Sequence, residues 1–324
     1  MKNMDITIVI PAFNEEESLK ILVDEIHTVL SSNYNYEIIL IDDGSSDKTW
    51  NVMSSLSLSQ SCKAIRFKKN TGKSAALDVG FVHASGKVVI TMDADLQDDP
   101  NEIPALYDLI VNHGYHLVSG WKKRRLDPLS KTVPTKLYNW ATRLMSGIKL
   151  HDFNCGLKAY ALDVVKDIRL SAEMHRYIPL LVKYAGYHNI GEKVVNHRKR
   201  SYGATKYGGW NRFSNGLLDL ISISFSHKFG RAPMHLFGLL GLLCFFIGFV
   251  IAGYLTYAKY ILLEFNMTDR PLFYLSVLCM ILGSQLFLSG FLGELIVRNR
   301  PIDHTAKINE KLGFIHATDI TPFF

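Results

Sequence analysis

The chain has 324 residues, of which 48% are hydrophobic and 20% charged, with a mean hydropathy of +0.09. It is too long for one ordinary domain and slightly too apolar for a purely soluble chain. Its net charge of +6 favours phosphates or a membrane surface as partners, and we expect no nucleic acid. Four widely spaced cysteines argue against structural zinc and for a reducing compartment: Cys62, Cys155, Cys244 and Cys279.

In chain order, the first third alternates apolar runs with amphipathic helices. Strands are predicted at residues 6–10, 37–41, 64–67 and 88–92. The helix after the first strand should be capped by Asn14, and the helix after the third strand should open at Gly72. This alternation predicts a doubly wound α/β sheet, in which ligands bind outside the carboxyl ends of the strands.

Polar clusters follow these strands and should line one crevice. Asp93 and Asp95 stand one residue apart after the fourth strand, with Gln97 two residues further on. Such oxygen ligands suit Mg²⁺ or Mn²⁺, which takes its remaining ligands from substrate phosphates. Acidic residues after a strand also form turns or cap helices. This alternative stays open for Asp93 and Asp95 and also for Asp42–Gly44.

A further helix is predicted near residues 103–110 and a strand at 116–120. A basic run follows this strand on the presumed ligand side of the sheet. It could bind the phosphate of a lipid, rest on anionic headgroups or be a solvated loop. The candidate anion-binding residues are Lys122, Lys123, Arg124 and Lys131.

The C-terminal third changes character. Residues 211–232 have the pattern of interfacial amphipathic helices, and 234–257 and 271–297 are apolar stretches long enough to span a bilayer. Basic residues before the first span and after the second predict that both ends are cytoplasmic. A buried helical hairpin is the alternative. Residues 301–324 are expected to form a cytoplasmic tail.

Four segments, taken in order, resemble the successive motifs of family 2 glycosyltransferases with the GT-A fold, in particular the polyprenyl-phosphate glycosyltransferases. These segments are Ile10–Glu16, Asp42–Asp47, Gly72–Lys73 and Asp93–Gln97. The resemblance implies a GT-A (Rossmann-like) mixed sheet in a cytosolic domain, residues 1–210, followed by interfacial helices and a two-helix transmembrane hairpin at 233–300.

The resemblance also implies roles for individual residues. Asp93, Asp95 and Gln97 would hold the metal ion, and Asp95 and Asp152 would be catalytic. Asp152 could be a base or orient the acceptor, although a turn aspartate is the alternative. The nucleotide would be contacted by Pro11, Ala12, Asn14, Glu15, Asp43, Lys73, Asp93 and Ala94. A loop carrying Arg200, Thr205 and Lys206 would close over the diphosphate.

The predicted function is inverting transfer of a sugar from a nucleotide-sugar to polyprenyl phosphate at the cytoplasmic face of the inner membrane. UDP-glucose is favoured, with GDP-mannose or another UDP-sugar as alternatives. The expected partners are this donor, the lipid acceptor and the membrane, and self-association is left open. The competing hypotheses are a processive polysaccharide synthase and a non-catalytic membrane protein that binds sugar nucleotides. The first normally needs more membrane spans, and the second would bind nucleotide without turnover.

Overall fold

The structure is a computed structural model of the chain. It describes residues 4–58, 61–123, 139–140, 142–144, 146–170, 174–198, 233–263, 269–298 and 308–312. The chain divides into two compact units. Unit 1 comprises Met1–Leu220 and Thr305–Phe324, and unit 2 comprises Ile221–His304.

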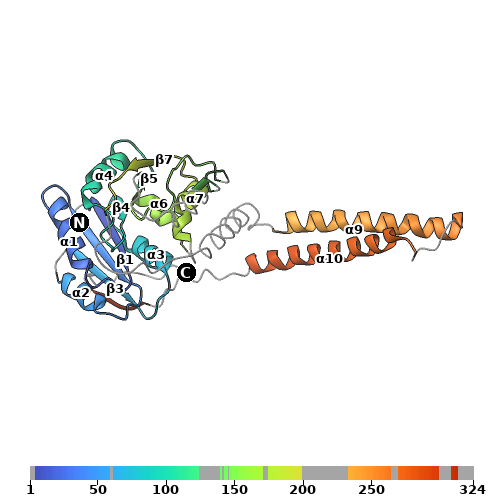
Figure 1. Ribbon diagram of the computed structural model, residues 1–324, viewed down its shortest axis with the longest axis horizontal. Coiled ribbons are helices and arrows are strands. Elements are labelled where there is room, and N and C mark those ends of the chain that lie inside the picture. Colours follow the sequence, from blue (N-terminus) through green and yellow to red (C-terminus); the bar gives the residue numbers. More distant parts are fainter. Residues whose placement is uncertain are drawn as a thin grey trace. The chain divides into compact units, whose positions relative to one another are not determined.

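The described part of unit 1 contains an eight-stranded mixed sheet with the order β7-β5-β6-β4-β1-β2-β3-β8 (Figure 1). The neighbours β4-β1-β2-β3 run parallel, as predicted, and β7 is parallel to β5. Strand β6 is antiparallel to both its neighbours, and β8 is antiparallel to β3. The strands are β1 (Ile6–Ala12), β2 (Tyr36–Asp42), β3 (Cys62–Phe67), β4 (Val88–Thr91), β5 (Leu117–Trp121), β6 (Lys158–Ala161), β7 (Ile190–Val194) and β8 (Ile308–Leu312).

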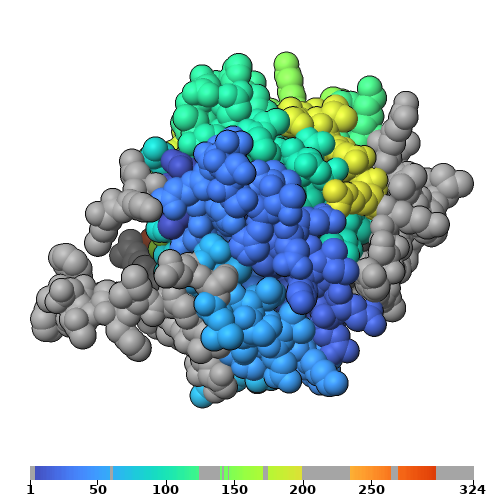
Figure 2. All heavy atoms as spheres, turned by 90° about the vertical axis from the view of Figure 1, so that its left-hand side faces the viewer, coloured from blue at the N-terminus to red at the C-terminus, as the bar shows by residue number. Residues whose placement is uncertain are grey.

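Helices cover both faces of this sheet, which explains why its central strands are apolar on both sides. Alternate side chains of β1 enter different cores: Ile8 packs with the first helix layer and Val9 with the second. The first layer contains α1 (Leu19–Leu30), α2 (Thr49–Leu56), η1 (Pro100–Glu102) and α4 (Ile103–Val111). The second contains α3 (Lys73–His83), α6 (Leu162–Asp167), η2 (Met174–Tyr177) and α7 (Ile178–Tyr184). Residues of the N-terminal third, blue to teal, dominate the face in Figure 2.

The start of α1 differs from the sequence prediction. The helix begins at Leu19 after Ser18, and Asn14 is not its cap. Asn14 instead adopts a left-handed conformation, with φ 54°. Its backbone N–H donates to Ser45 Oγ at 2.9 Å, and its side-chain oxygen accepts from the Ser46 N–H at 2.9 Å. The loop after β2 therefore supplies hydrogen-bond partners for Asn14, which the sequence analysis placed at the start of the helix.

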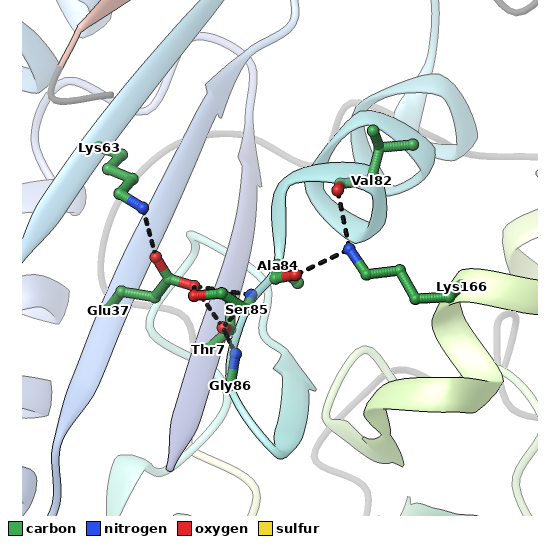
Figure 3. A network of polar contacts seen from close by, with 8 residues as sticks. All are labelled: Thr7, Glu37, Lys63, Val82, Ala84, Ser85, Gly86 and Lys166. Carbon is green, nitrogen blue, oxygen red and sulfur yellow. Dashed lines mark hydrogen bonds and ion pairs between the residues drawn. The ribbon is translucent and has the colours of Figure 1, made fainter. Parts of the chain in front are cut away.

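A buried glutamate fixes the opposite ends of the strands (Figure 3). Glu37 on β2 is 2% exposed and accepts hydrogen bonds from Thr7 Oγ1 at 2.6 Å and from Ser85 Oγ at 2.6 Å. Lys63 Nζ pairs with its other oxygen at 2.6 Å. Burial alone would raise the pKa of Glu37, but Lys63 and the hydrogen bonds lower it below its ordinary value. These contacts hold the turn from α3 into β4 against the sheet.

The described part of unit 2 is a helical hairpin. Helix α9 (Pro233–Tyr257) continues into a π-helical turn, η3 (Ala258–Leu262), and α10 (Pro271–Arg298) packs against α9. Glycines permit this packing, since a Cβ on Gly241 would lie 2.6 Å from the carbonyl oxygen of Gly283. Met234–Leu262 and Pro271–Ile296 each contain an 18-residue window of high mean hydropathy, 2.6 and 1.9 respectively, so both are long and apolar enough to cross a membrane.

Candidate active site

The carboxyl ends of β1 and β2 come together as predicted. Ala12 is paired with Asp42 in the parallel register, and the Asp43 N–H donates to the Ala12 carbonyl at 2.9 Å. The Glu15 N–H donates to Thr49 Oγ1 at 2.8 Å. Pro11 is the residue before Ala12 on β1. The predicted nucleotide-binding segments at the ends of these two strands are therefore joined by hydrogen bonds along one edge of the sheet.

Asp43 organises the loop that leads into α3. Its two carboxylate oxygens accept from the N–H groups of Thr71 at 2.7 Å and Gly72 at 2.9 Å. Burial raises the pKa of Asp43, and these two hydrogen bonds oppose that rise. Gly72 then precedes Lys73, so Asp43 also sets the position from which the lysine projects.

Lys73 reaches across this edge to Asp93. Their side chains form an ion pair in which the Asp93 side chain is 34% exposed. Burial would raise the pKa of Asp93, but the neighbouring lysines, Lys73 first, lower it to about 2. The carboxylate lies directly against Gly156, where a Cβ would be 2.4 Å from Asp93 Oδ2. Asp93 thus connects the loop after β4 to the 151–157 loop before β6.

The segment Asp93–Asp99, called the acidic loop below, turns sharply. Leu96 adopts a left-handed φ of 61°, and Asp95 Oδ1 accepts from the Gln97 N–H at 3.2 Å. The Gln97 carbonyl accepts from the Arg198 N–H at 3.0 Å. Ala94 is buried between the two aspartates. Asp93, Asp95 and Gln97 therefore lie on one short turn at the carboxyl end of β4.

Lys122 departs from its predicted place in an anion site. Its ammonium lies 2.8 Å from Asp98 Oδ1, and the two side chains are only 11% and 0% exposed. Burial would lower the pKa of Lys122, but Asp98 raises it above its ordinary value. Asp98 Oδ2 also accepts from the Asp93 N–H at 3.3 Å. Lys122 therefore faces inward because a buried carboxylate under the acidic loop needs a cation. Lys123 is exposed, with its ammonium 5.6 Å from the centre of the Trp121 ring.

Asp152 is 2% exposed and lies on the 151–157 loop. Its Oδ1 accepts from the Asn154 N–H at 3.0 Å, which is a turn-forming contact, and its carbonyl accepts from Ser119 Oγ at 3.1 Å. Thr91 Oγ1 donates to the Gly156 carbonyl at 2.8 Å, so the same loop is bound to β4. Asp152 is therefore held on the loop that contacts Asp93, and one of its carboxylate oxygens makes a turn-forming contact.

A divalent ion fits the chemistry of these residues. The pKa of about 2 keeps Asp93 ionised at neutral pH, and Asp95 follows it on the same turn. Among the described residues, no group of three or more His, Cys, Asp or Glu side chains is placed to hold a metal. Two carboxylates with further ligands from a diphosphate are the set that Mg²⁺ and Mn²⁺ accept. The acidic loop thus suits an ion that arrives with a nucleotide.

Several predicted residues lie outside the described part of the chain: Arg124, Lys131, Arg200, Thr205 and Lys206. Sequence reasoning missed two polar contacts beside the site. Lys158 is buried and donates to the Cys155 carbonyl, and Ser74 Oγ accepts from the His175 N–H at 3.0 Å. No spacing marks the Ser74 contact in the sequence, because Ser74 lies on α3 and His175 on η2.

The fold of unit 1 is the GT-A fold. The solved structure of glucosyl-3-phosphoglycerate synthase from Mycobacterium tuberculosis in complex with Mn²⁺ and UDP-glucose matches 69% of this chain and 79% of that chain. Its TM-score is 0.51 and its sequence identity 20%. The family model for glycosyl transferase family 2 matches residues 7–169. The chain belongs to glycosyl transferase family 2 and is a glycosyltransferase.

Relatives match nearly the whole chain. Dodecaprenyl-phosphate galacturonate synthase from Rhizobium johnstonii is 35% identical over 92% of this chain and 89% of its own length. Undecaprenyl-phosphate 4-deoxy-4-formamido-L-arabinose transferase from Aeromonas hydrophila is 32% identical over 92% of this chain and 91% of its own length. The similarity therefore extends through both apolar helices as well as the GT-A domain.

Proposed function

We propose that this chain is an inverting glycosyltransferase that moves a sugar from a nucleotide-sugar to polyprenyl phosphate at the cytoplasmic face of the inner membrane. The observation that carries the proposal is the contact between the acidic loop and the 151–157 loop. There Asp93 lies against Gly156 and pairs with Lys73. The relatives named for sugar transfer to dodecaprenyl or undecaprenyl phosphate support the acceptor.

The donor nucleotide is proposed to bind along the carboxyl ends of β1, β2 and β3. A pocket there is lined by Gly44, Ser45, Arg66, Phe67 and Lys68, next to Asp43 in the chain. The Asp43 carboxylate can accept hydrogen bonds from a base or ribose. Each of its oxygens already accepts one backbone N–H and can accept a second hydrogen bond. The names of the relatives favour galacturonate or 4-deoxy-4-formamido-L-arabinose as the sugar, with UDP-glucose to be tested beside them.

At the reacting centre, Asp93 and Asp95 would hold the ion, with Gln97 beside them. A bound Mg²⁺ or Mn²⁺ supplies charge stabilisation to the departing diphosphate. Lys73 would turn from Asp93 to the diphosphate oxygens. The acceptor phosphate is largely a dianion at neutral pH, so it needs cations more than it needs a base. Asp152 is therefore proposed to orient the acceptor.

The experiment compares Asp95→Ala with Asp24→Ala, a substitution of an exposed aspartate on α1. Asp95→Ala should abolish transfer while the circular dichroism spectrum and unfolding temperature stay at wild-type values. Asp24→Ala should keep full activity. Excess chelator should reproduce the loss in the wild-type protein. Full transfer by Asp95→Ala, or in chelator, would refute the role of the acidic loop.

A further inference from the structure

The first turn of α3, which carries Lys73, has no side-chain cap. The residue at the cap position is Gly72, with a φ of 100°, and no side chain there accepts a hydrogen bond from the first turn. The first N–H groups of a helix have no partner within the helix. Lys73 is the first residue of α3. Its backbone is therefore fixed by contacts from other segments of the chain.

Two such contacts lie on either side of Lys73. Before it, Asp43 accepts from the Gly72 N–H at 2.9 Å. After it, Ser74 Oγ accepts from the His175 N–H at 3.0 Å and also lies 3.0 Å from His175 Nδ1. Ser74 is only 1% exposed, so water does not compete for these bonds. Lys73 thus lies between one anchor that follows β2 and a second anchor on η2.

The charge state of His175 suits a supporting role. Burial, followed by the nearby cations Lys73 and Arg176, lowers the pKa of His175 well below its ordinary value. The imidazole is therefore uncharged at neutral pH. An uncharged ring can accept the Ser74 O–H at Nδ1 while Ser74 Oγ accepts the backbone N–H. A charged imidazolium at this position would repel the Lys73 ammonium. The neutral ring supports the helix end and leaves Lys73 as the cation that meets an anion.

We propose that His175 is a positioning residue for Lys73 and acts through Ser74. It keeps the first turn of α3 in place while the Lys73 ammonium exchanges Asp93 for the diphosphate of the donor. His175 does this through the backbone of α3 and does not contact the ligand. The inference rests on the proposed function, because that proposal assigns Lys73 to the diphosphate. It follows that His175 matters for nucleotide binding only while residue 73 is a lysine.

The test is calorimetric titration of the full-length protein with UDP and with GDP in the presence of Mn²⁺, and the tighter ligand is then used for the variants. His175→Leu should weaken binding about tenfold, because the hydrogen bond at Nδ1 is lost. His175→Asn, whose amide can take the place of Nδ1, should stay within about twofold of wild type. In a Lys73→Met background, adding His175→Leu should change binding by less than about twofold.

The matched control is His27→Leu. His27 is also half-buried, and its Nδ1 lies 2.5 Å from the Tyr36 hydroxyl, but it belongs to α1 in the other helix layer. This variant should bind nucleotide as the wild type does. Circular dichroism checks that each variant is folded. Should His175→Leu not fold, Ser74→Ala removes the same link from the α3 side and takes its place.

An equal fold loss from His175→Leu with Lys73 present and with Lys73→Met would overturn the proposal, since His175 would then act on the fold alone. Wild-type affinity in His175→Leu would overturn it as well, and so would His175→Asn binding as weakly as His175→Leu. These outcomes leave nucleotide binding by the wild-type protein intact. Wild-type protein that binds neither UDP nor GDP would instead refute the proposed function, and this inference with it.

Discussion

The buried pair Lys122–Asp98 offers the sharpest test of how the acidic loop is supported. In Lys122→Met, the Asp98 carboxylate would stay 0% exposed and lose the ammonium that lies 2.8 Å away. Breaking a buried pair by removing one partner costs about 3–5 kcal/mol, since the remaining charge is uncompensated. Removing the Lys122 ammonium should also disturb the position of Asp93, because the Asp93 N–H donates to Asp98.

A cost of about 3 kcal/mol corresponds to a fall in Tm of about 6–12 °C for a unit of this size. Thermal unfolding in detergent, followed by circular dichroism, measures it. The double variant Lys122→Met with Asp98→Asn should regain most of the stability, because it leaves no buried charge. An unchanged Tm together with a raised KM for the phosphorylated lipid would refute this reasoning. It would show that Lys122 binds the acceptor, as the sequence alone suggested.

Three further substitutions test the framework around the site. Glu37→Gln should lower the Tm at neutral pH, and because the folded pKa lies below 4.5, the difference from wild type should shrink as pH falls below that value. Gly44→Ala should lower the Tm more than Gly114→Ala. Both glycines have a positive φ, but only at Gly44 would a Cβ clash with the backbone, lying 2.5 Å from the carbonyl carbon of Lys69. Gly156→Ala should weaken nucleotide binding in a calorimetric titration, with an unchanged circular dichroism spectrum, because its Cβ would displace Asp93.

The central strands were predictable because each is a continuous apolar run. The predicted strand 37–41 corresponds to β2, and the run at 88–92 contains β4. Strands β6, β7 and β8 were not predicted. Strand β6 is four residues long and begins with a buried lysine, so it lacks any apolar periodicity. Strand β8 lies in the segment expected to be a tail, and its pairing with β3 is a long-range contact.

The site was predictable where residues follow a strand directly. Asp43 and Asp93 follow the carboxyl ends of β2 and β4, the parallel strands on either side of β1, so topology alone brings their loops to one edge. The partners of these residues were not predictable in the same way. The basic residues after β5 were treated as one surface in the sequence analysis, yet the Lys122 side chain is only 11% exposed, whereas Lys123 is exposed. The burial of one lysine depends on Asp98, and local sequence does not encode that contact.

The most direct test of the proposed activity is transfer of label from donor to lipid. Membranes containing the full-length protein are incubated with undecaprenyl phosphate and radiolabelled UDP-galacturonate, UDP-4-deoxy-4-formamido-L-arabinose, UDP-glucose or GDP-mannose. The prediction is that label from one donor enters the organic phase, requires Mg²⁺ or Mn²⁺ and disappears with Asp95→Ala. Label that stays in the aqueous phase for every donor, or that accumulates in a water-soluble polymer, would contradict the proposed transfer to polyprenyl phosphate.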